Sequence, residues 1–458
     1  MRRFLVWLAA GALVGAATPA GLAAQGYGIY EHSACMMARA GTGVASSCGD
    51  GSAVFFNPAG ILGSGKGVLS AGATVIMPRG GFTSDISGTT TDLKKLNFVI
   101  PHLYWTRDLG ADYAVGFGVF APYGLTTEWP TTFEGRFLGY RSKIQSIYLQ
   151  PTFAARVSPT LTVGAGLDYS LVSVNLRQRA DLYSTTLAPG VTGGNLGFQK
   201  GTDFADVDLE GDGNGIGFNV GVTWKAHPRV SVGARYLSQQ NIYIDQADAN
   251  ITQIQTGLVL AAGNPLGLPA GTPVDAVVAP QFTGTGALVD QKGSTRLTFP
   301  DQFTVGATFT ATQQLRVLAD VQWVHWKKFE TLALQFERLP QRIIQESYEN
   351  STGVRLGAEY DLGTRYMFRA GVLSHGAAAP DQTVTPNLPE GPRSEFTAGL
   401  GAQLTPTVHL DLAYQYIDQA DRRGRTTDGG LAQPTAAVNN GLYTFNAHLV
   451  GATLTYKF

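Results

Sequence analysis

The stretch Leu161-Thr-Val-Gly-Ala-Gly-Leu-Asp-Tyr-Ser-Leu171 decides the fold class. Its odd-numbered residues are apolar, and its even-numbered residues are small or polar. Because successive side chains of a β-strand point to opposite faces, this strand has one apolar face and one polar face. The same alternation recurs over 218–225, 408–416 and 450–458, which indicates an all-β protein. A soluble sandwich also alternates, so this pattern alone leaves sandwich and barrel open.

The joins between strands separate these two architectures. They alternate between tight turns, such as Ser158-Pro159, and seven long loops, of which 179–212 and 244–293 are the longest. Transmembrane barrels have an even number of strands, short periplasmic turns and long extracellular loops. We therefore predict a transmembrane antiparallel β-barrel of fourteen strands in the bacterial outer membrane. The expected strands are 67–77, 96–107, 112–121, 143–157, 160–178, 213–226, 229–243, 294–311, 314–330, 347–361, 364–376, 393–405, 407–420 and 440–458.

The composition fits a barrel and excludes other classes. Charged residues make up 15 % of the 458 residues, and 57 are glycine. The 33 basic side chains stand against 34 acidic ones, so the chain lacks the basic excess of a nucleic-acid-binding protein. A helical membrane protein needs apolar runs of about 18 residues or more, and none follows the N-terminus. Tyrosine and tryptophan near strand ends, including Trp129 and Trp326, are expected at the membrane interfaces.

The N-terminus predicts the cellular compartment. Arg2 and Arg3 precede an apolar stretch and the small residues Ala23 and Ala24, which is typical of a signal peptide over 1–24. Cys35 and Cys48 follow this segment, and an oxidising compartment favours a disulfide between them, with two buried thiols as the alternative. No histidine accompanies them at ligand spacing, so we expect no metal site, and no cofactor motif is present.

The segment 25–66 does not alternate like a strand. Fourteen strands enclose a lumen wider than barrel side chains alone fill. We therefore expect 25–66 to fold into the lumen as a plug, followed by the barrel over 67–458.

A resemblance to a known family rests on this segment. The run Gly51-Ser-Ala-Val-Phe-Phe-Asn-Pro-Ala-Gly60, with its triplet Asn57, Pro58 and Ala59, closely resembles the N-terminal hatch of the FadL family of outer-membrane long-chain fatty-acid transporters. Weaker matches follow in order at 121–125, 299–303, 368–372 and Phe458. The resemblance implies a hatch-plugged barrel of fourteen strands. It also implies passive uptake of hydrophobic molecules, with capture at extracellular loops, an apolar pocket above the hatch and lateral release at a kinked third strand.

Three groups of residues are candidates for this pathway. Gly116, Gly118 and Pro122 lie in or end the expected third strand and favour a kink, although such glycines also suit a crowded lumen. Apolar loop residues are expected to form an exposed capture surface, or to pack on one another: Leu182, Tyr183, Ile251, Ile254, Leu258 and Leu260. Inward-facing arginines are candidate partners of a carboxylate headgroup, or of lumen acids such as Asp168, Asp320, Glu359 and Asp411: Arg156, Arg235, Arg355 and Arg369.

Other functions stay open as alternatives. The substrate is a fatty acid or, as the main alternative, an aromatic or other hydrocarbon. A general porin or an adhesin is an alternative of another class. The seven histidines sit singly and no Gly-x-Ser-x-Gly motif is present, so we expect no catalytic residues and no enzyme. The expected partners are a hydrophobic small molecule and outer-membrane lipid, with no nucleic acid, and the barrel is expected to be a monomer.

Overall fold

The computed structural model describes residues 26–363, 365–424 and 440–458. The predicted signal peptide, 1–24, lies outside the described residues. Over these described ranges, the helices are too short or too polar to cross a membrane.

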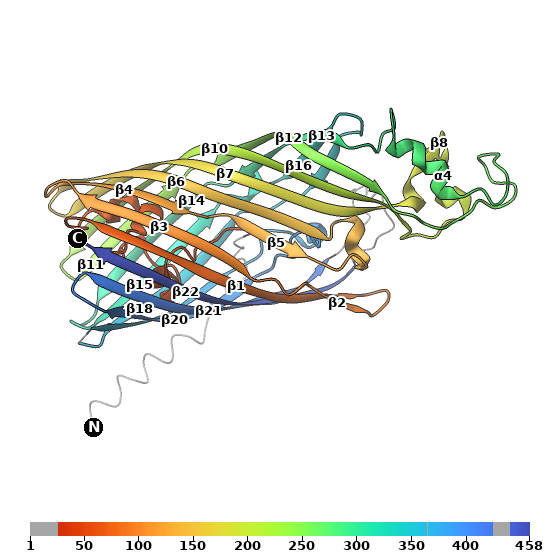
Figure 1. Cartoon of the computed structure of the whole chain (residues 1–458). Helices are drawn as coiled ribbons and strands as arrows, with labels where there is room; N and C mark the ends of the chain where they lie inside the picture. The colour runs from red at the N-terminus through yellow and green to blue at the C-terminus, as the bar shows by residue number, and fades with distance from the viewer. Residues whose placement is uncertain (1–25, 364, 425–439) are drawn as a thin grey trace, which may run out of the picture.

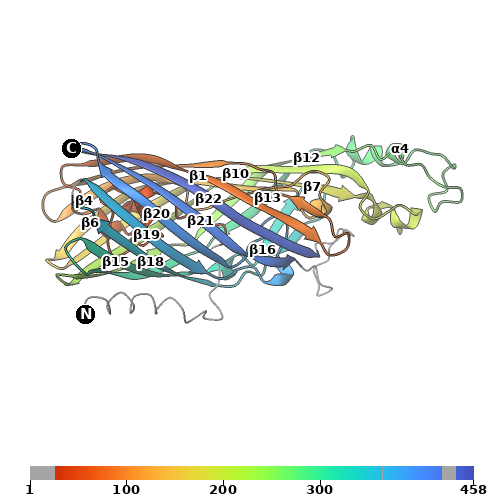
Figure 2. The same cartoon turned by 90° about the horizontal axis from the view of Figure 1, so that it is seen from below.

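Fourteen antiparallel strands form one closed barrel (Figures 1 and 2). Nine are uninterrupted: β1 (Val68–Ser84), β3 (Phe98–Asp108), β6 (Arg141–Ser158), β7 (Leu161–Asp181), β10 (Asp203–His227), β19 (Tyr366–His375), β20 (Arg393–Gln403), β21 (Val408–Gly424) and β22 (Gly441–Lys457). Five consist of two pieces each: β4 (Tyr113–Phe120) with β5 (Gly124–Glu128), β11 (Val230–Leu237) with β12 (Gln240–Gln253), β13 (Gln291–Phe299) with β14 (Gln302–Thr310), β15 (Leu315–Val324) with β16 (Thr331–Phe336), and β17 (Arg342–Gln345) with β18 (Ser351–Asp361). The barrel closes where β1 pairs with β22, from Val68 opposite Lys457 to Ser84 opposite Gly441.

The predicted fold class and strand number are confirmed, and the strands are longer at their extracellular ends than expected. β1 continues to Ser84, where the sequence predicted an end at 77, and β10 begins at Asp203 instead of 213. Beyond the bilayer the outward-facing side chains become polar, so apolar alternation stops while the hydrogen-bonded ladder goes on. The β1–β2 hairpin also extends past the barrel wall, with β2 (Thr90–Asp92) pairing to the end of β1.

The outer face carries the apolar band that a bilayer requires. On β6 the outward-facing positions are all apolar from Ile147 to Val157. A membrane-crossing strand needs about 9–11 residues at a tilt of about 45°. This stretch of β6 therefore corresponds to one crossing of the hydrocarbon core.

The long loops form a small folded unit beyond the extracellular rim (Figure 1). It contains η3 (Leu182–Ser184), β8 (Thr186–Ala188), β9 (Val191–Thr192), η4 (Gly194–Leu196), α4 (Val274–Val278) and η5 (Ala279–Phe282). Its core is apolar and buried, with Leu182, Phe204, Ile251, Leu260 and Val274 in mutual contact. The extensions of β7, β10 and β12 hold this unit on the barrel.

The N-terminal segment, residues 26–66, occupies the lumen near the end with the short turns (Figures 1 and 2). It contains α2 (Ala34–Ala38), α3 (Ala53–Phe56) and η1 (Pro58–Ile61). Ser33 caps α2 by accepting a hydrogen bond from the Met36 N–H at 3.2 Å, as a serine at this position commonly does. Every residue of α2 and α3 is buried, so these short helices are held by the barrel around them.

Candidate substrate pocket and N-terminal segment

The triplet Asn57-Pro58-Ala59 fixes the N-terminal segment to the barrel wall. The Asn57 side-chain oxygen accepts a hydrogen bond from the Ala59 N–H at 3.1 Å, which starts η1. The Asn57 side-chain amide donates to the backbone oxygens of Val44 and, at 3.0 Å, of Val222 on β10. The Pro58 carbonyl carbon stands 2.4 Å from where a Cβ at Gly164 would lie, so β7 needs a glycine there. These three residues are structural anchors.

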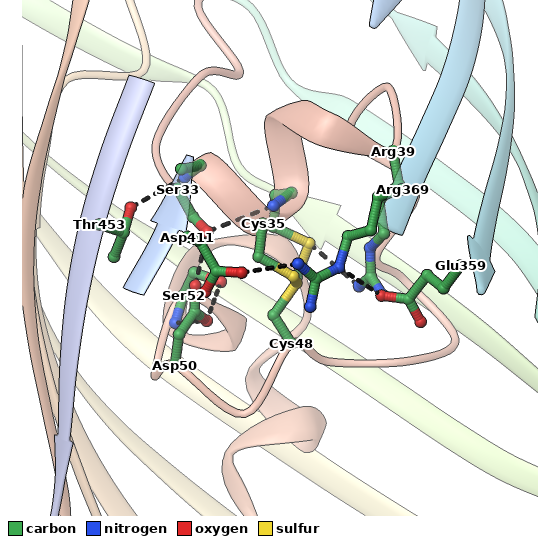
Figure 3. The surroundings of a disulfide bond; sticks show 12 residues. Ser33, Cys35, Arg39, Cys48, Asp50, Ser52, Glu359, Arg369, Asp411 and Thr453 are labelled. Carbon is green, nitrogen blue, oxygen red and sulfur yellow. Dashed lines mark hydrogen bonds and ion pairs between the residues drawn. A yellow bond between two sulfur atoms is a disulfide. The ribbon is translucent and has the colours of Figure 1, made fainter. Parts of the chain in front are cut away.

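A disulfide joins Cys35 in α2 to Cys48 in the following loop (Figure 3). Beside it, Asp50 accepts hydrogen bonds from the Ser33 hydroxyl at 2.5 Å and from the Ser52 N–H at 3.0 Å. The disulfide closes the loop that carries Arg39 and Ser46, and the hydrogen bonds of Asp50 tie the end of this loop back to the start of α2.

A buried ion-pair network links this loop to the barrel (Figure 3). The Glu359 carboxylate on β18 lies 3.1 Å from an Arg39 Nη and 2.9 Å from the Arg369 Nε. Arg369 also pairs with Asp411 at 2.6 Å, and Arg316 pairs with Glu359 at 2.6 Å. Because Arg369 is buried between two carboxylates, it is already neutralised, and the expectation that it meets a substrate headgroup is corrected.

The other candidate arginines also lie away from a substrate path. Arg235 is buried, donates to the Asn219 side-chain oxygen at 3.1 Å and covers the Phe55 ring at 4.2 Å. Arg355 covers the Tyr30 ring of the N-terminal segment at 4.2 Å. Arg156 is exposed at the periplasmic end of β6 and pairs with Asp112 at 3.4 Å. The inward parity of Arg156 was correct, but the residue stands below the N-terminal segment.

The third strand is broken between Phe120 and Gly124. β4 pairs with both of its neighbours, β3 and β6, whereas β5 pairs with β6. In the described ranges, the part of β3 before Leu103 pairs with β1 alone. The wall between β3 and β5 is therefore open. Pro122 lies at the break, where a residue without an N–H cannot continue a ladder.

The N-terminal segment lies along this break. The Ile29 N–H donates to the Pro122 carbonyl at 2.8 Å, and the Gly124 N–H donates to the Tyr27 carbonyl at 2.9 Å. Gly116 and Gly118, predicted as part of a kink, lie in the regularly paired part of β4. A Cβ at Gly118 would approach Val54 of α3 to 2.8 Å, so these two glycines serve close packing against the N-terminal segment.

An apolar cavity of about 350 Å³ lies at the break. Its inner lining includes Ile417, Phe445 and Leu449, which face the lumen. Its outer lining includes Val99 and Ile147, which are 64 % and 48 % exposed on the lipid-facing side of the barrel. Because residues of both faces line one cavity, the cavity passes through the wall between β3 and β5. Its size and apolar lining suit a small hydrophobic ligand.

Arg393 on β20 is a lining residue that we did not single out in the sequence. Its Nε donates to the Gln419 side-chain oxygen at 2.9 Å, and its guanidinium lies over the Phe445 ring at 5.4 Å. In the described part of the chain, its two Nη atoms form no ion pair and no side-chain hydrogen bond that would occupy them. The sequence already indicated that Arg393 faces the lumen, because it lies two residues before Glu395 in the expected strand 393–405 and so shares its inward parity.

Two carboxylates also line the cavity, and both already have donors. Glu395 accepts from the Gln415 amide at 2.6 Å and lies 3.1 Å from the His375 ring nitrogen. Glu31 accepts from the same amide at 2.9 Å and from the Tyr30 N–H at 2.9 Å. Burial, followed by the nearby Glu395 charge, raises the pKa of Glu31. The Arg393 guanidinium is thus the cavity's cation with donor atoms still available.

The extracellular loop residues form the core of the folded loop unit. Leu182, Ile251 and Leu260 are buried there, which corrects the expectation that they form an exposed capture surface. The three others, Tyr183, Ile254 and Leu258, are half-buried at its edge. Trp129 and Trp326 were expected at the membrane interfaces, but both are fully buried inside the barrel.

A closed barrel with a filled lumen and an apolar cavity through its wall defines an outer-membrane transport protein for hydrophobic compounds. The family described as outer membrane protein transport protein (OMPP1/FadL/TodX) matches residues 14–458, and the chain belongs to this family. This match confirms the predicted family and the outer-membrane localisation.

Individual relatives agree with this assignment. The chain is 23 % identical over 443 residues to the long-chain fatty acid transport protein of Escherichia coli O6:H1, covering 94 % of each. It is 23 % identical over 411 residues to outer membrane protein P1 of Haemophilus influenzae, covering 86 % of this chain and 83 % of the relative. A Pseudomonas aeruginosa FadL homologue has a similar structure, with a TM-score of 0.80 and 20 % identity, over 95 % of this chain and all of the other. The Pseudomonas putida toluene transporter TodX gives a TM-score of 0.68 at 17 % identity, over 95 % of this chain and 100 % of the other.

Proposed function

We propose that this protein mediates passive uptake of long-chain fatty acids and releases them laterally between β3 and β5. The observation that carries the proposal is the cavity lined by lumen-facing Phe445 and lipid-facing Ile147. A hydrophobic molecule that leaves through the wall enters the bilayer without crossing a water-filled pore. Capture takes place at the extracellular mouth, where Tyr183, Ile254 and Leu258 are partly exposed.

The N-terminal segment serves as the hatch that closes the axial route. An axial path requires this segment to move, and movement breaks the buried Arg39–Glu359 pair. Although Arg316 and Arg369 still neutralise Glu359, breaking this buried hydrogen bond between charged groups costs about 1.5–3 kcal/mol. A lateral path leaves that pair in place and needs only the short contacts of Tyr27–Ile29 with the broken strand to yield. The lateral route therefore costs less free energy than the axial route.

Arg393 favours a fatty acid over a hydrocarbon as the substrate. A guanidinium with free Nη donors binds a carboxylate through charge-assisted hydrogen bonds. Its Nε is fixed by Gln419, so the donors are already oriented toward the cavity. A relative is named as a long-chain fatty acid transport protein, and solved structures of similar fold include toluene transporters, so both substrate classes occur among similar proteins.

The test compares the uptake of labelled oleate and of toluene by cells that carry wild-type protein, Arg393→Gln or Arg393→Lys. Loss of hydrogen bonds to a charged group, worth about 1.5–3 kcal/mol, predicts a roughly 10- to 100-fold higher oleate concentration for half-maximal uptake by Arg393→Gln. Toluene uptake should not change, and Arg393→Lys should lie between the two. Unchanged oleate uptake by Arg393→Gln would show that Arg393 does not bind the headgroup, and wild-type uptake of toluene without uptake of oleate would identify a hydrocarbon transporter. A comparable uptake of small polar solutes by the wild type would instead indicate a porin.

A further inference from the structure

Four basic residues frame the extracellular edge of the wall opening: Lys94, Lys95, Arg141 and Lys143. We call them the basic lip. Lys94 and Lys95 lie in the segment that leads into β3, which begins at Phe98, and the other two lie on β6 beside β5. The Lys94 N–H donates to the Glu128 carbonyl at the end of β5 at 2.8 Å. This bond joins the β3 side of the opening to the β5 side above the cavity.

The basic lip faces outward, just above the apolar band. Lys143 has the same parity on β6 as the lipid-exposed Ile147 and stands four residues further toward the extracellular end. Four residues rise roughly 13 Å along a strand, which is about 9 Å along the membrane normal at a tilt of 45°. Its cross-strand neighbours on the same face, Thr126 and Asn175, are uncharged. The lip therefore lies at the height of the lipid headgroups of the outer leaflet.

Nearby acids balance the charge of the lip only in part. Glu128 pairs with Lys94 at 2.7 Å and lies 3.7 Å from the Arg141 Nε. Within the described ranges, no ion pair includes Lys95 or Lys143. Further along the same face, Arg177 lies opposite Arg141, and Arg177 and Arg179 pair with Asp206 and Asp208. With Glu210, opposite Asn175, these six cations and four carboxylates leave a local charge of +2, whereas the whole chain carries −1.

We propose that the basic lip binds the phosphorylated headgroup of an outer-leaflet glycolipid of the lipid A type. Clustered lysines at a membrane surface attract anionic headgroups, and an ammonium group binds phosphate as a point charge. A lipid held there places its acyl chains directly below the lip, over Val99 and Ile147 at the mouth of the cavity. The bound lipid then seals the lipid-facing mouth when no substrate is passing.

The test measures binding of lipid A to the full-length protein in detergent, by native mass spectrometry, with EDTA present so that divalent cations cannot bridge acids to phosphates. The Lys95→Gln/Lys143→Gln variant removes the two unpaired charges and keeps both contacts of Glu128. The matched control is Lys327→Gln/Lys328→Gln, which removes two exposed lysines after β15, away from the opening. The two lip charges predict a roughly 10- to 30-fold loss of affinity for bisphosphorylated lipid A, and the control should bind like the wild type.

The phosphate dependence identifies the ligand. Wild type should bind monophosphorylated lipid A more weakly and the dephosphorylated lipid weakest, and the lip variant should lose this order. Equal binding of lipid A by the lip variant and the wild type would overturn the proposal. If the lip variant loses affinity for oleate but not for lipid A, the lip binds departing fatty acids. That result would overturn the proposal as well. Because no transport is measured, this result stands apart from the oleate uptake test.

Discussion

An Nη of Arg39 lies 3.1 Å from the Glu359 carboxylate, and the exposed fractions of the two side chains are 0 % and 1 %. Arg39 belongs to the N-terminal segment and Glu359 to β18, so this contact joins the N-terminal segment to the barrel wall. Without Arg39, Glu359 keeps its pairs with Arg316 and Arg369, so the loss is that of a buried hydrogen bond between charged groups, worth about 1.5–3 kcal/mol. We predict that Arg39→Met raises the conductance of the barrel in planar bilayers and speeds proteolysis of the N-terminal segment.

Lys94→Gln is the control for this prediction, because it breaks the exposed Lys94–Glu128 pair. A surface pair contributes about 0–1 kcal/mol to stability, so the conductance of the Lys94→Gln variant should match that of the wild type. Equal conductance of Arg39→Met and wild type would show that the segment is held by other contacts.

Gly164 should not tolerate a side chain. A Cβ there would lie 2.4 Å from the Pro58 carbonyl carbon, which is backbone and cannot turn aside. Overpacking of this kind costs about 1–3 kcal/mol. Gly164→Ala should lower the temperature at which the folded barrel loses its fast migration on gels. Gly353→Ala, whose new Cβ would meet its nearest neighbour at 3.5 Å, should migrate like the wild type at every temperature.

The Cys35–Cys48 disulfide should stabilise the N-terminal segment. A cross-link closing a loop of about 15 residues contributes about 3 kcal/mol in the chain-entropy account. The bonded residues are 13 apart, so a gain of this order is expected. Cys35→Ala/Cys48→Ala should expose the segment to protease more rapidly, and reductant should reproduce this in the wild type while leaving the variant unchanged. Identical protease sensitivity of oxidised and reduced wild type would argue against the bond.

Asp108, the last residue of β3 before the first periplasmic turn, holds the end of the N-terminal segment. Its carboxylate accepts the backbone N–H groups of Gly63 at 3.0 Å, Ser64 at 3.2 Å and Gly65 at 2.8 Å. Asp108→Ala removes all three acceptor contacts, so limited proteolysis near Ser64 should become severalfold faster. Asp112→Ala, at the end of the turn that precedes β4, should leave the cleavage rate unchanged. A rate unaffected by Asp108→Ala would place the anchor of this linker elsewhere.

The sequence predicted those parts of the fold that follow from contact with lipid. Alternation over Leu161–Leu171 identified a strand because one face of it is lipid-exposed, and tight turns fixed the order of strands. The extension of β10 before 213 was missed because its outward side chains are polar. Trp326 was placed at the interface because sequence spacing cannot reveal that its strand breaks and turns the ring inward.

The candidate site was predicted less well, for a related reason. Parity placed Arg369 and Arg393 on the same inner surface, but height within the barrel decides their surroundings. Arg369 lies beside Glu359 and Asp411 at the N-terminal segment, and Arg393 lines the cavity. The partners of each arginine come from strands that are distant in the chain, so their pairing follows only from the assembled barrel.

Lateral passage through the wall is tested most directly by narrowing the opening from its lipid side. Val99→Trp/Ile147→Trp places two large rings on the outward residues that line the cavity. The control, Leu167→Trp/Leu400→Trp, places the same rings on lipid-facing positions that do not line it. We predict a severalfold slower uptake of labelled oleate for the first variant and wild-type uptake for the control, at equal amounts of folded barrel in the outer membrane. Wild-type uptake by Val99→Trp/Ile147→Trp would contradict lateral release.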